Sequence, residues 1–140
     1  MAEQIDQGGI PKPERGGFKP VVLVVEDDPI LRRLEERTLI ELGVEHSLAQ
    51  DVAQARKILE ENPGKFSHIF SDFDMPGVSG GEFAEEVRGK FSNLSITLMT
   101  GRPSDDDSLE GLKDKGVSFI QKPFSISDVE KLLTEESKTK

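Results

Sequence analysis

Acidic side chains gather at two places in this sequence, and a threonine and a lysine follow them along the chain. Glu26-Asp27-Asp28 form the first group and Ser71-Asp72-Phe73-Asp74 contain the second, whereas Thr100 and Lys122 stand apart. Clustered carboxylates repel one another and resist ionisation unless a cation lies among them. Mg²⁺ suits such a group, because it prefers carboxylate and carbonyl oxygens and keeps some of its waters.

If the fold brought these residues together, they could carry out phosphoryl transfer. Asp72 would be the nucleophile and would form an aspartyl phosphate. The metal and Lys122 would offset charge on the transferring oxygens, and the Thr100 hydroxyl would donate a hydrogen bond to one of them. Each motif alone has a plainer explanation, such as a helix N-cap for Asp28 or a loop for the lysine–proline pair. The hypothesis therefore depends on the elements that position these segments.

Four of the five predicted strands lead directly into the polar segments. Residues 21–25 form a continuous apolar run, which is typical of a central parallel strand that is buried on both faces. Shorter strands are predicted around residues 69–70, 96–99 and 117–120, and the alternating residues 44–48 read as an edge strand. Each of the four apolar strands is followed within two residues by one of the candidate residues.

The segments between the strands have helical patterns with recognisable ends. The predicted N-caps are Asp28, Asp51, Ser79 and Ser125, and Gly43 is the predicted left-handed stop of the first helix. The helix after Thr100 is weak, since Leu109 and Leu112 are its only large apolar residues and Gly111 lies between them. The expected inward stripes are Leu31, Leu34, Leu39 and Leu42 in the first helix, and Ile126, Val129, Leu132 and Leu133 in the last.

This alternation of strands and helices predicts an α/β fold with a doubly wound, five-stranded parallel sheet between two layers of helices. In the strand order 2-1-3-4-5, the first and third strands are neighbours at the switch point. Open sheets of this kind place their sites outside the carboxyl ends of the strands at that point. We therefore expect the two acidic groups to share one crevice, with Thr100 and Lys122 on its other side.

Composition narrows the function further. The 140 residues carry a net charge of −9, which argues against nucleic acid as a direct partner. The chain contains no cysteine and no apolar run long enough to span a membrane, and residues 1–4 do not read as the start of a signal peptide. We expect a cytoplasmic protein with a flexible tail over residues 1–19 and one domain over residues 20–140.

Taken together, the residues resemble the receiver domains of two-component signalling, including the small chemotaxis-type regulators. The resemblance covers nearly all of residues 20–134 and includes V-V-E-D-D-P at 24–29, S-D-F-D-M-P-G-V-S-G at 71–80, L-M-T-G at 98–101 and F-I-Q-K-P-F at 119–124. It implies a flavodoxin-like three-layer sandwich and a signalling domain that modifies only itself. The implied phosphoryl donor is a histidine kinase or a histidine phosphotransfer protein.

The resemblance also implies roles for single residues. Asp72 would be the phosphoacceptor, and Lys122 would pair with the phosphoryl group, with a possible cis bond before Pro123. The implied Mg²⁺ ligands are Glu26, Asp27, Asp72 and the backbone carbonyl of Asp74. Thr100 and Phe119 would form the switch pair that reshapes the surface around the fourth helix, although Phe119 could equally be a core aromatic. Asp74 and Arg102 flank the site, and we expect them to set the lifetime of the phosphorylated state.

Two alternatives stay open from the sequence. One is a receiver fold that binds a partner without phosphorylation. The other is a phosphatase of the haloacid dehalogenase type, which also uses an Asp-x-Asp motif; there, however, the motif comes before the other acidic pair, whereas here Glu26 and Asp27 come first. No output domain is visible, and a monomer or weak dimer is expected. The pathway, the donor and the downstream partner cannot be read from the sequence.

Overall fold

The computed structural model describes residues 19–75, 77, 79–91, 93–101, 117–122 and 124–138, with side chains up to residue 133. The predicted N-terminal tail, apart from residue 19, lies outside the described residues. So does the weak helix predicted after Thr100. Among the residues described, no helix is both long enough and apolar enough to cross a membrane.

Five parallel strands form the sheet. They are β1 (Val21–Val25), β2 (Glu45–Ala49), β3 (His68–Asp72), β4 (Ser95–Thr100) and β5 (Ser118–Gln121). Their order is β2-β1-β3-β4-β5, which confirms the predicted doubly wound topology. Every neighbouring pair is parallel, so the carboxyl ends of all five strands lie at one edge of the sheet.

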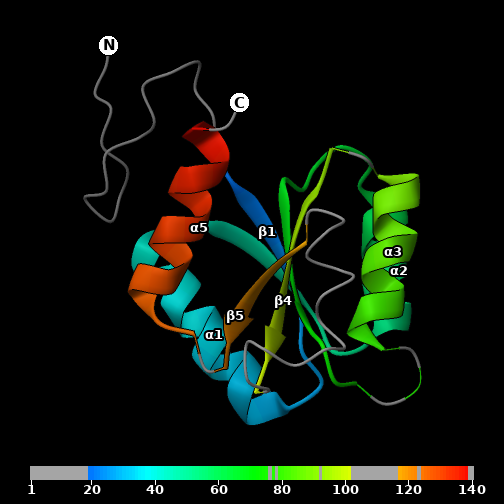
Figure 1. Ribbon diagram of the computed structural model, residues 1–140, viewed down its shortest axis with the longest axis horizontal. Helices are drawn as coiled ribbons and strands as arrows, with labels where there is room; N and C mark the ends of the chain where they lie inside the picture. Colours follow the sequence, from blue (N-terminus) through cyan, green and yellow to red (C-terminus); the bar gives the residue numbers. More distant parts are fainter. Residues whose placement is uncertain are drawn as a thin grey trace.

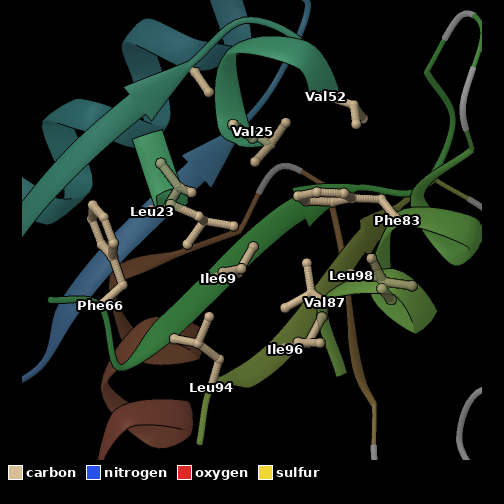
Figure 2. Close-up of a cluster of buried hydrophobic side chains, with 14 of the residues drawn as sticks. Leu23, Val25, Val52, Phe66, Ile69, Phe83, Val87, Leu94, Ile96 and Leu98 are labelled. Carbon is tan, nitrogen blue, oxygen red and sulfur yellow. The ribbon is translucent and has the colours of Figure 1, made fainter. Parts of the chain in front are cut away.

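The described helices cover both faces of this sheet. They are α1 (Pro29–Leu42), α2 (Val52–Glu61), α3 (Gly80–Lys90) and α5 (Ile126–Lys138). Figure 1 shows α1 and α5 on one side of the sheet and α2 and α3 on the other, which is the flavodoxin-like three-layer arrangement. A separate apolar core fills each interface. On the α3 side, Figure 2 shows Phe83 and Val87 facing Ile69 and Ile96 of the sheet.

The predicted helix ends are formed by local hydrogen bonds. Asp28 accepts bonds from the backbone N–H groups of residues 30 and 31, and Asp51 accepts one from residue 54. Ser79 and Glu82 form a reciprocal capping box at the start of α3. Gly43 ends α1 with a φ of 71°, a left-handed conformation that glycine adopts at little cost. These caps fix where each helix begins after its strand.

The inward face of α1 differs from the predicted leucine stripe. Leu34 is 45% exposed, whereas Glu35, the next residue, is only 2% exposed and shares the inward face with Leu39. A helix turns about 100° per residue, so residues 35 and 39 lie on one face and Leu34 points away from it. In α5, Ile126 is likewise exposed, while Val129 and Leu133 are buried as expected. The prediction was wrong at Leu34 and at Ile126.

Candidate functional site

The register of the sheet brings the ends of β1 and β3 together. Val25 pairs with Ser71, so the residues that follow them, Glu26 and Asp72, lie side by side at the switch point. Both are buried, at 0% and 1% exposure, although both are acidic. A buried carboxylate is costly unless it is paired or binds a cation, and the sheet holds two of them next to each other.

A third carboxylate completes an oxygen-rich cluster. One carboxylate oxygen from each of Glu26, Asp27 and Asp72 lies within 4.8 Å of the others. Asp27 is exposed, so the cluster opens to solvent on one side. Three oxygen ligands, with room left for water, match what Mg²⁺ prefers.

Lys122 approaches this cluster from the end of β5. Its Nζ atom lies 3.0 Å from Asp72 Oδ1 and 3.9 Å from Glu26 Oε1. The backbone N–H of Lys122 donates a 2.9 Å hydrogen bond to the carbonyl of Thr100, which ties β5 to the end of β4. Burial alone would lower the pKa of Lys122, but its hydrogen bond to Asp72 and the nearby carboxylates raise this pKa overall. Lys122 is therefore a stable cation beside two buried acids.

The backbone around Glu26 is held by three further hydrogen bonds. Its N–H donates to the carbonyl of Ala49 at 3.0 Å, and its own carbonyl accepts from Arg32 Nη1 at 2.8 Å. Its Oε2 accepts from the N–H of Asp28 at 3.2 Å. These contacts fix the main chain and one carboxylate oxygen, whereas Oε1 has no hydrogen-bond donor among the described residues.

The carboxyl group of Asp72 is strongly perturbed. Its pKa is raised to about 7, mainly by burial and also by the charge of Glu26, and the hydrogen bond from Lys122 offsets only part of this rise. The N–H of Asp74 also donates to Asp72 Oδ1 at 3.1 Å, which favours the ionised form. Strongly perturbed acids in a cleft are typical of functional sites. A divalent cation between Asp72 and Glu26 would relieve their repulsion, so the residues present fit Mg²⁺.

Glu35 of α1 is a further buried acid that the sequence analysis missed. It is 2% exposed, and neither of its carboxyl oxygens has a hydrogen-bond partner among the described residues. Burial, followed by the charge of Glu26, raises the pKa of Glu35 to about 9. The raised pKa means that Glu35 keeps its proton at neutral pH in the metal-free protein and adds no further buried negative charge. The apolar pattern placed the inward face of this helix on the leucine stripe and gave no signal for a buried glutamate.

The two raised pKa values predict how stability depends on pH in metal-free protein. In the unfolded chain both carboxyl groups ionise near pH 4. Between about pH 5 and about pH 7 the folded protein keeps protons that the unfolded chain has lost, so the free energy of unfolding should fall as pH rises. Each group can contribute up to about 1.4 kcal/mol per pH unit.

Urea denaturation in the presence of a chelator measures this slope. Glu35→Leu removes one of the two groups and should make the slope clearly shallower. A metal-free protein whose stability is constant or rises across this pH range would contradict the assignment of Asp72 and Glu35 as perturbed acids.

The turn after β3 depends on a glycine. The N–H of Phe73 donates to the carbonyl of Met99 at 2.8 Å, and the N–H of Gly80 donates to the carbonyl of Phe73 at 2.9 Å. A Cβ atom at Gly80 would overlap the carbonyl oxygen of Asp72 and lie 2.6 Å from Cα of Phe73. The start of α3 can therefore approach the Asp72 backbone only because residue 80 has no side chain.

Gly80→Ala is accordingly expected to lower the free energy of unfolding by about 1–3 kcal/mol, because the overlap involves backbone atoms that cannot turn aside. Gly89→Ala is the matched control in the same helix, where an added Cβ meets no described atom within 4 Å. That control should be stabilising by about 0.5–1 kcal/mol. If both variants changed the free energy of unfolding in urea by the same amount, residue 80 would not be in tight contact with the Asp72 backbone.

Of the remaining predicted site residues, the structure describes Thr100 and Phe119. Thr100 is buried at the end of β4, one residue past Met99, which pairs with Asp72. Phe119 is partly buried in β5, and its ring packs edge-on against Phe73 with centroids 6.2 Å apart. Arg102 and Pro123 lie outside the described residues.

Comparison with known proteins shows one family. The family described as "Response regulator receiver domain" has a model that matches residues 22–134. The transcriptional regulatory protein YrkP of Bacillus subtilis, itself named as uncharacterised, is 36% identical over 104 residues, which are 74% of this chain and 43% of that protein. The response regulator protein FleR of Pseudomonas aeruginosa is 33% identical over 74% of this chain and 21% of its own length. The chain thus spans less than half the length of these relatives.

The similar solved structures agree with this family match. The chemotaxis protein CheY4 of Vibrio cholerae superposes with a TM-score of 0.73 at 28% identity, over 84% of this chain and 98% of that one. The receiver domain of Ssk1 from Saccharomyces cerevisiae, solved together with the histidine phosphotransfer signalling protein Ypd1, is also similar. Its TM-score is 0.72 at 26% identity, over 84% of this chain and 88% of that one.

Proposed function

Since this chain belongs to the response regulator receiver domain family of two-component signalling, we propose that it is a switch that accepts a phosphoryl group on Asp72. The observation that carries the proposal is the 3.0 Å contact between Lys122 Nζ and Asp72 Oδ1 inside the acidic cluster. A buried nucleophile, a neighbouring cation and a cluster of oxygen ligands are the parts that phosphoryl transfer requires.

Glu26, Asp27 and Asp72 would hold Mg²⁺, with the backbone carbonyl of Asp74 as a proposed fourth ligand. The bound ion would supply positive charge against the oxygens of the transferring phosphoryl group. Glu26 and Asp27 would hold the ion beside the nucleophile, and Asp27 lies on the exposed side where a donor could approach.

The proposed transfer is a simple displacement. A carboxylate oxygen of Asp72 forms a bond to phosphorus while the bond from phosphorus to the donor atom breaks, and the donor leaves with that electron pair. Lys122 already bonds to the same carboxylate, so it is placed to bond to the phosphoryl oxygens without a large movement. The buried backbone at Glu26 and Gly80 keeps the surrounding groups in place.

Thr100 and Phe119 are the proposed switch pair. Thr100 ends the strand next to β3, so a phosphoryl group on Asp72 would attract its hydroxyl. Phe119 pairs with Leu98 two residues upstream of Thr100, and its ring lies against Phe73 beside the nucleophile. A shift of Thr100 would therefore alter the space around the Phe119 ring and change the surface near β5.

Asp74 and Arg102 are proposed to set the lifetime of the phosphorylated state. Asp74 is exposed, and its N–H bonds to Asp72, so its side chain lies at the entrance used by an attacking water. Asp74→Asn and Arg102→Ala are each expected to speed dephosphorylation by roughly 3–10-fold, about 0.7–1.4 kcal/mol in barrier height. Phosphate release after removal of the donor measures the rate, with Asp51→Asn as the control. An unchanged rate in both variants would contradict the role.

The proposed donor is a histidine kinase or a histidine phosphotransfer protein. The similar Ssk1 receiver domain has been crystallised with such a phosphotransfer protein, Ypd1. The open side of the cluster at Asp27 would let a phosphohistidine reach Asp72. We propose that the resulting state is read by a protein partner.

The experiment that tests the proposed function is intact mass spectrometry after incubation with acetyl phosphate, with Mg²⁺ or with a chelator. A gain of one phosphoryl group that depends on Mg²⁺ is expected. No gain with Mg²⁺, together with unchanged binding of a partner by Asp72→Ala, would favour a receiver fold that works without phosphorylation. Sustained turnover of a small phosphate ester would instead indicate a phosphatase.

A further inference from the structure

Arg32 of α1 contacts the acidic site but has no part in the proposed phosphoryl transfer. Its Nη1 atom donates a 2.8 Å hydrogen bond to the backbone carbonyl of Glu26, six residues earlier in the chain. Arg32 is partly buried, whereas the next residue, Arg33, is exposed. A charged side chain of α1 thus reaches back to the main chain of a proposed metal ligand.

This hydrogen bond occupies a place that a strand would otherwise fill. The N–H of Glu26 donates to the carbonyl of Ala49 on β2, as it would in a regular ladder. In a continued parallel ladder, the carbonyl of Glu26 would accept from the N–H of residue 51. β2 ends at Ala49, however, and Asp51 is the N-cap of α2. Arg32 supplies a donor to this carbonyl where the ladder between β1 and β2 stops.

The same bond helps to fix the loop that follows β1. The N–H of Asp28 donates to Glu26 Oε2 at 3.2 Å, and the N–H of Arg32 donates to the carbonyl of Asp28 at 2.8 Å. Residues 26 and 28 are therefore both held against the first turns of α1. The carbonyl that Arg32 contacts belongs to the peptide group between Glu26 and Asp27, so its orientation affects the direction of both side chains.

We infer that Arg32 is a positioning residue of the acidic site, whose hydrogen bond fixes the peptide between Glu26 and Asp27 so that both carboxylates converge with Asp72 for metal binding. The inference rests on the proposed function, because these carboxylates need a fixed direction only if they hold Mg²⁺. Groups that orient metal ligands typically change metal affinity about 10–100-fold when they are removed. Arg32 bonds to the main chain of a ligand residue, so we expect a loss at the lower end of this range.

The charge of Arg32 alone would have the opposite effect. A guanidinium near the site repels a divalent cation, so removal of its positive charge would strengthen Mg²⁺ binding. Loss of the orienting hydrogen bond would weaken it. A contact that only stabilised the start of α1 would leave the Mg²⁺ affinity of the folded protein unchanged. The sign of the change in affinity therefore separates these three roles.

Isothermal titration of the full chain with Mg²⁺ alone, without any phosphoryl donor, tests the inference. Arg32→Met keeps a long side chain without a donor and should bind Mg²⁺ about tenfold more weakly than wild type. Arg33→Met is the matched control, because it removes the same charge from the exposed neighbouring position; its affinity should stay within about twofold of wild type. Arg32→Lys keeps the charge and a donor, and its affinity should stay within about threefold.

Phosphorylation by acetyl phosphate gives a second readout. In Arg32→Met the Mg²⁺ concentration for half-maximal rate should rise about tenfold, while the rate at saturating Mg²⁺ should stay within about threefold of wild type. Circular dichroism should show that all variants are folded, since Arg32 is only partly buried. Mg²⁺ binding by Arg32→Met that equals or exceeds wild type would overturn the inference and leave the proposed function intact, as would an equal loss in Arg32→Lys. A folded wild type that binds no Mg²⁺ would contradict the proposed function as well.

Discussion

Asp72→Asn is expected to abolish phosphorylation by acetyl phosphate, with a loss of at least about 100-fold in rate. The amide is nearly the same size as the carboxylate, so the change removes the nucleophile without changing the packing at the end of β3. It also removes one of the buried carboxylates that crowd Glu26, and the folded state should persist. Intact mass spectrometry over a time course measures the loss.

Asp51→Asn is the matched control for this variant. Asp51 is the exposed N-cap of α2, and asparagine caps helices about as well as aspartate. It makes the same chemical change on the same protein and should be phosphorylated at the wild-type rate. Retention of a Mg²⁺-dependent phosphoryl group by Asp72→Asn would show that another residue is the acceptor.

Lys122→Ala is expected to slow phosphorylation by about 100-fold, the usual cost of removing one group that stabilises developing oxygen charge. Its Nζ atom is the cation nearest to Asp72, at 3.0 Å, and it is also 3.9 Å from Glu26. Because the hydrogen bond from Lys122 lowers the pKa of Asp72, its loss should raise that pKa above about 7. More of the nucleophile would then be neutral at physiological pH in the metal-free protein.

The rate of adduct formation at several pH values measures both effects. Lys131→Ala, an exposed lysine of α5 outside the acidic cluster, is the control and should behave as wild type. A Lys122→Ala rate within about threefold of wild type would mean that the contact with Asp72 does not contribute to transfer. Circular dichroism should show that both variants are folded.

Local signals explain why most of the fold could be predicted from the sequence. The N-caps at Asp28, Asp51 and Ser79 act through hydrogen bonds within three residues, so they are visible without knowledge of the tertiary structure. The buried strands are continuous apolar runs, and the alternation with helices leaves few possible topologies. The order 2-1-3-4-5 that was expected for a doubly wound sheet agrees with the structure.

The juxtaposition of Glu26, Asp72 and Lys122 was foreseeable for the same reason. Each lies at or just past the end of a parallel strand, and parallel strands end at one edge of the sheet. Which atoms meet was not foreseeable, because the contact between Lys122 and Asp72 depends on side-chain directions. The raised pKa of Asp72 likewise depends on burial that only the packed structure shows.

Glu35 could not be predicted, since hydrophobic periodicity identifies an inward face only when that face is apolar. In α1 the pattern is misleading, because Ile30, Leu34 and Ile40 are exposed while a glutamate is buried. The charges of Glu26, Lys122 and Asp72 all act on the pKa of this glutamate, so it lies near the acidic site. A polar site therefore changed the composition of the helix that covers it, and the stripe predicted at Leu34 was wrong.

The most direct test of the central claim is chemical trapping of the phosphoryl group on Asp72. Borohydride reduces an aspartyl phosphate to homoserine, and peptide mass spectrometry then identifies the residue that was modified. After incubation with acetyl phosphate and Mg²⁺, we predict homoserine at position 72 and its absence when a chelator replaces Mg²⁺. Homoserine at another aspartate, or none despite complete incubation with Mg²⁺, would contradict the account.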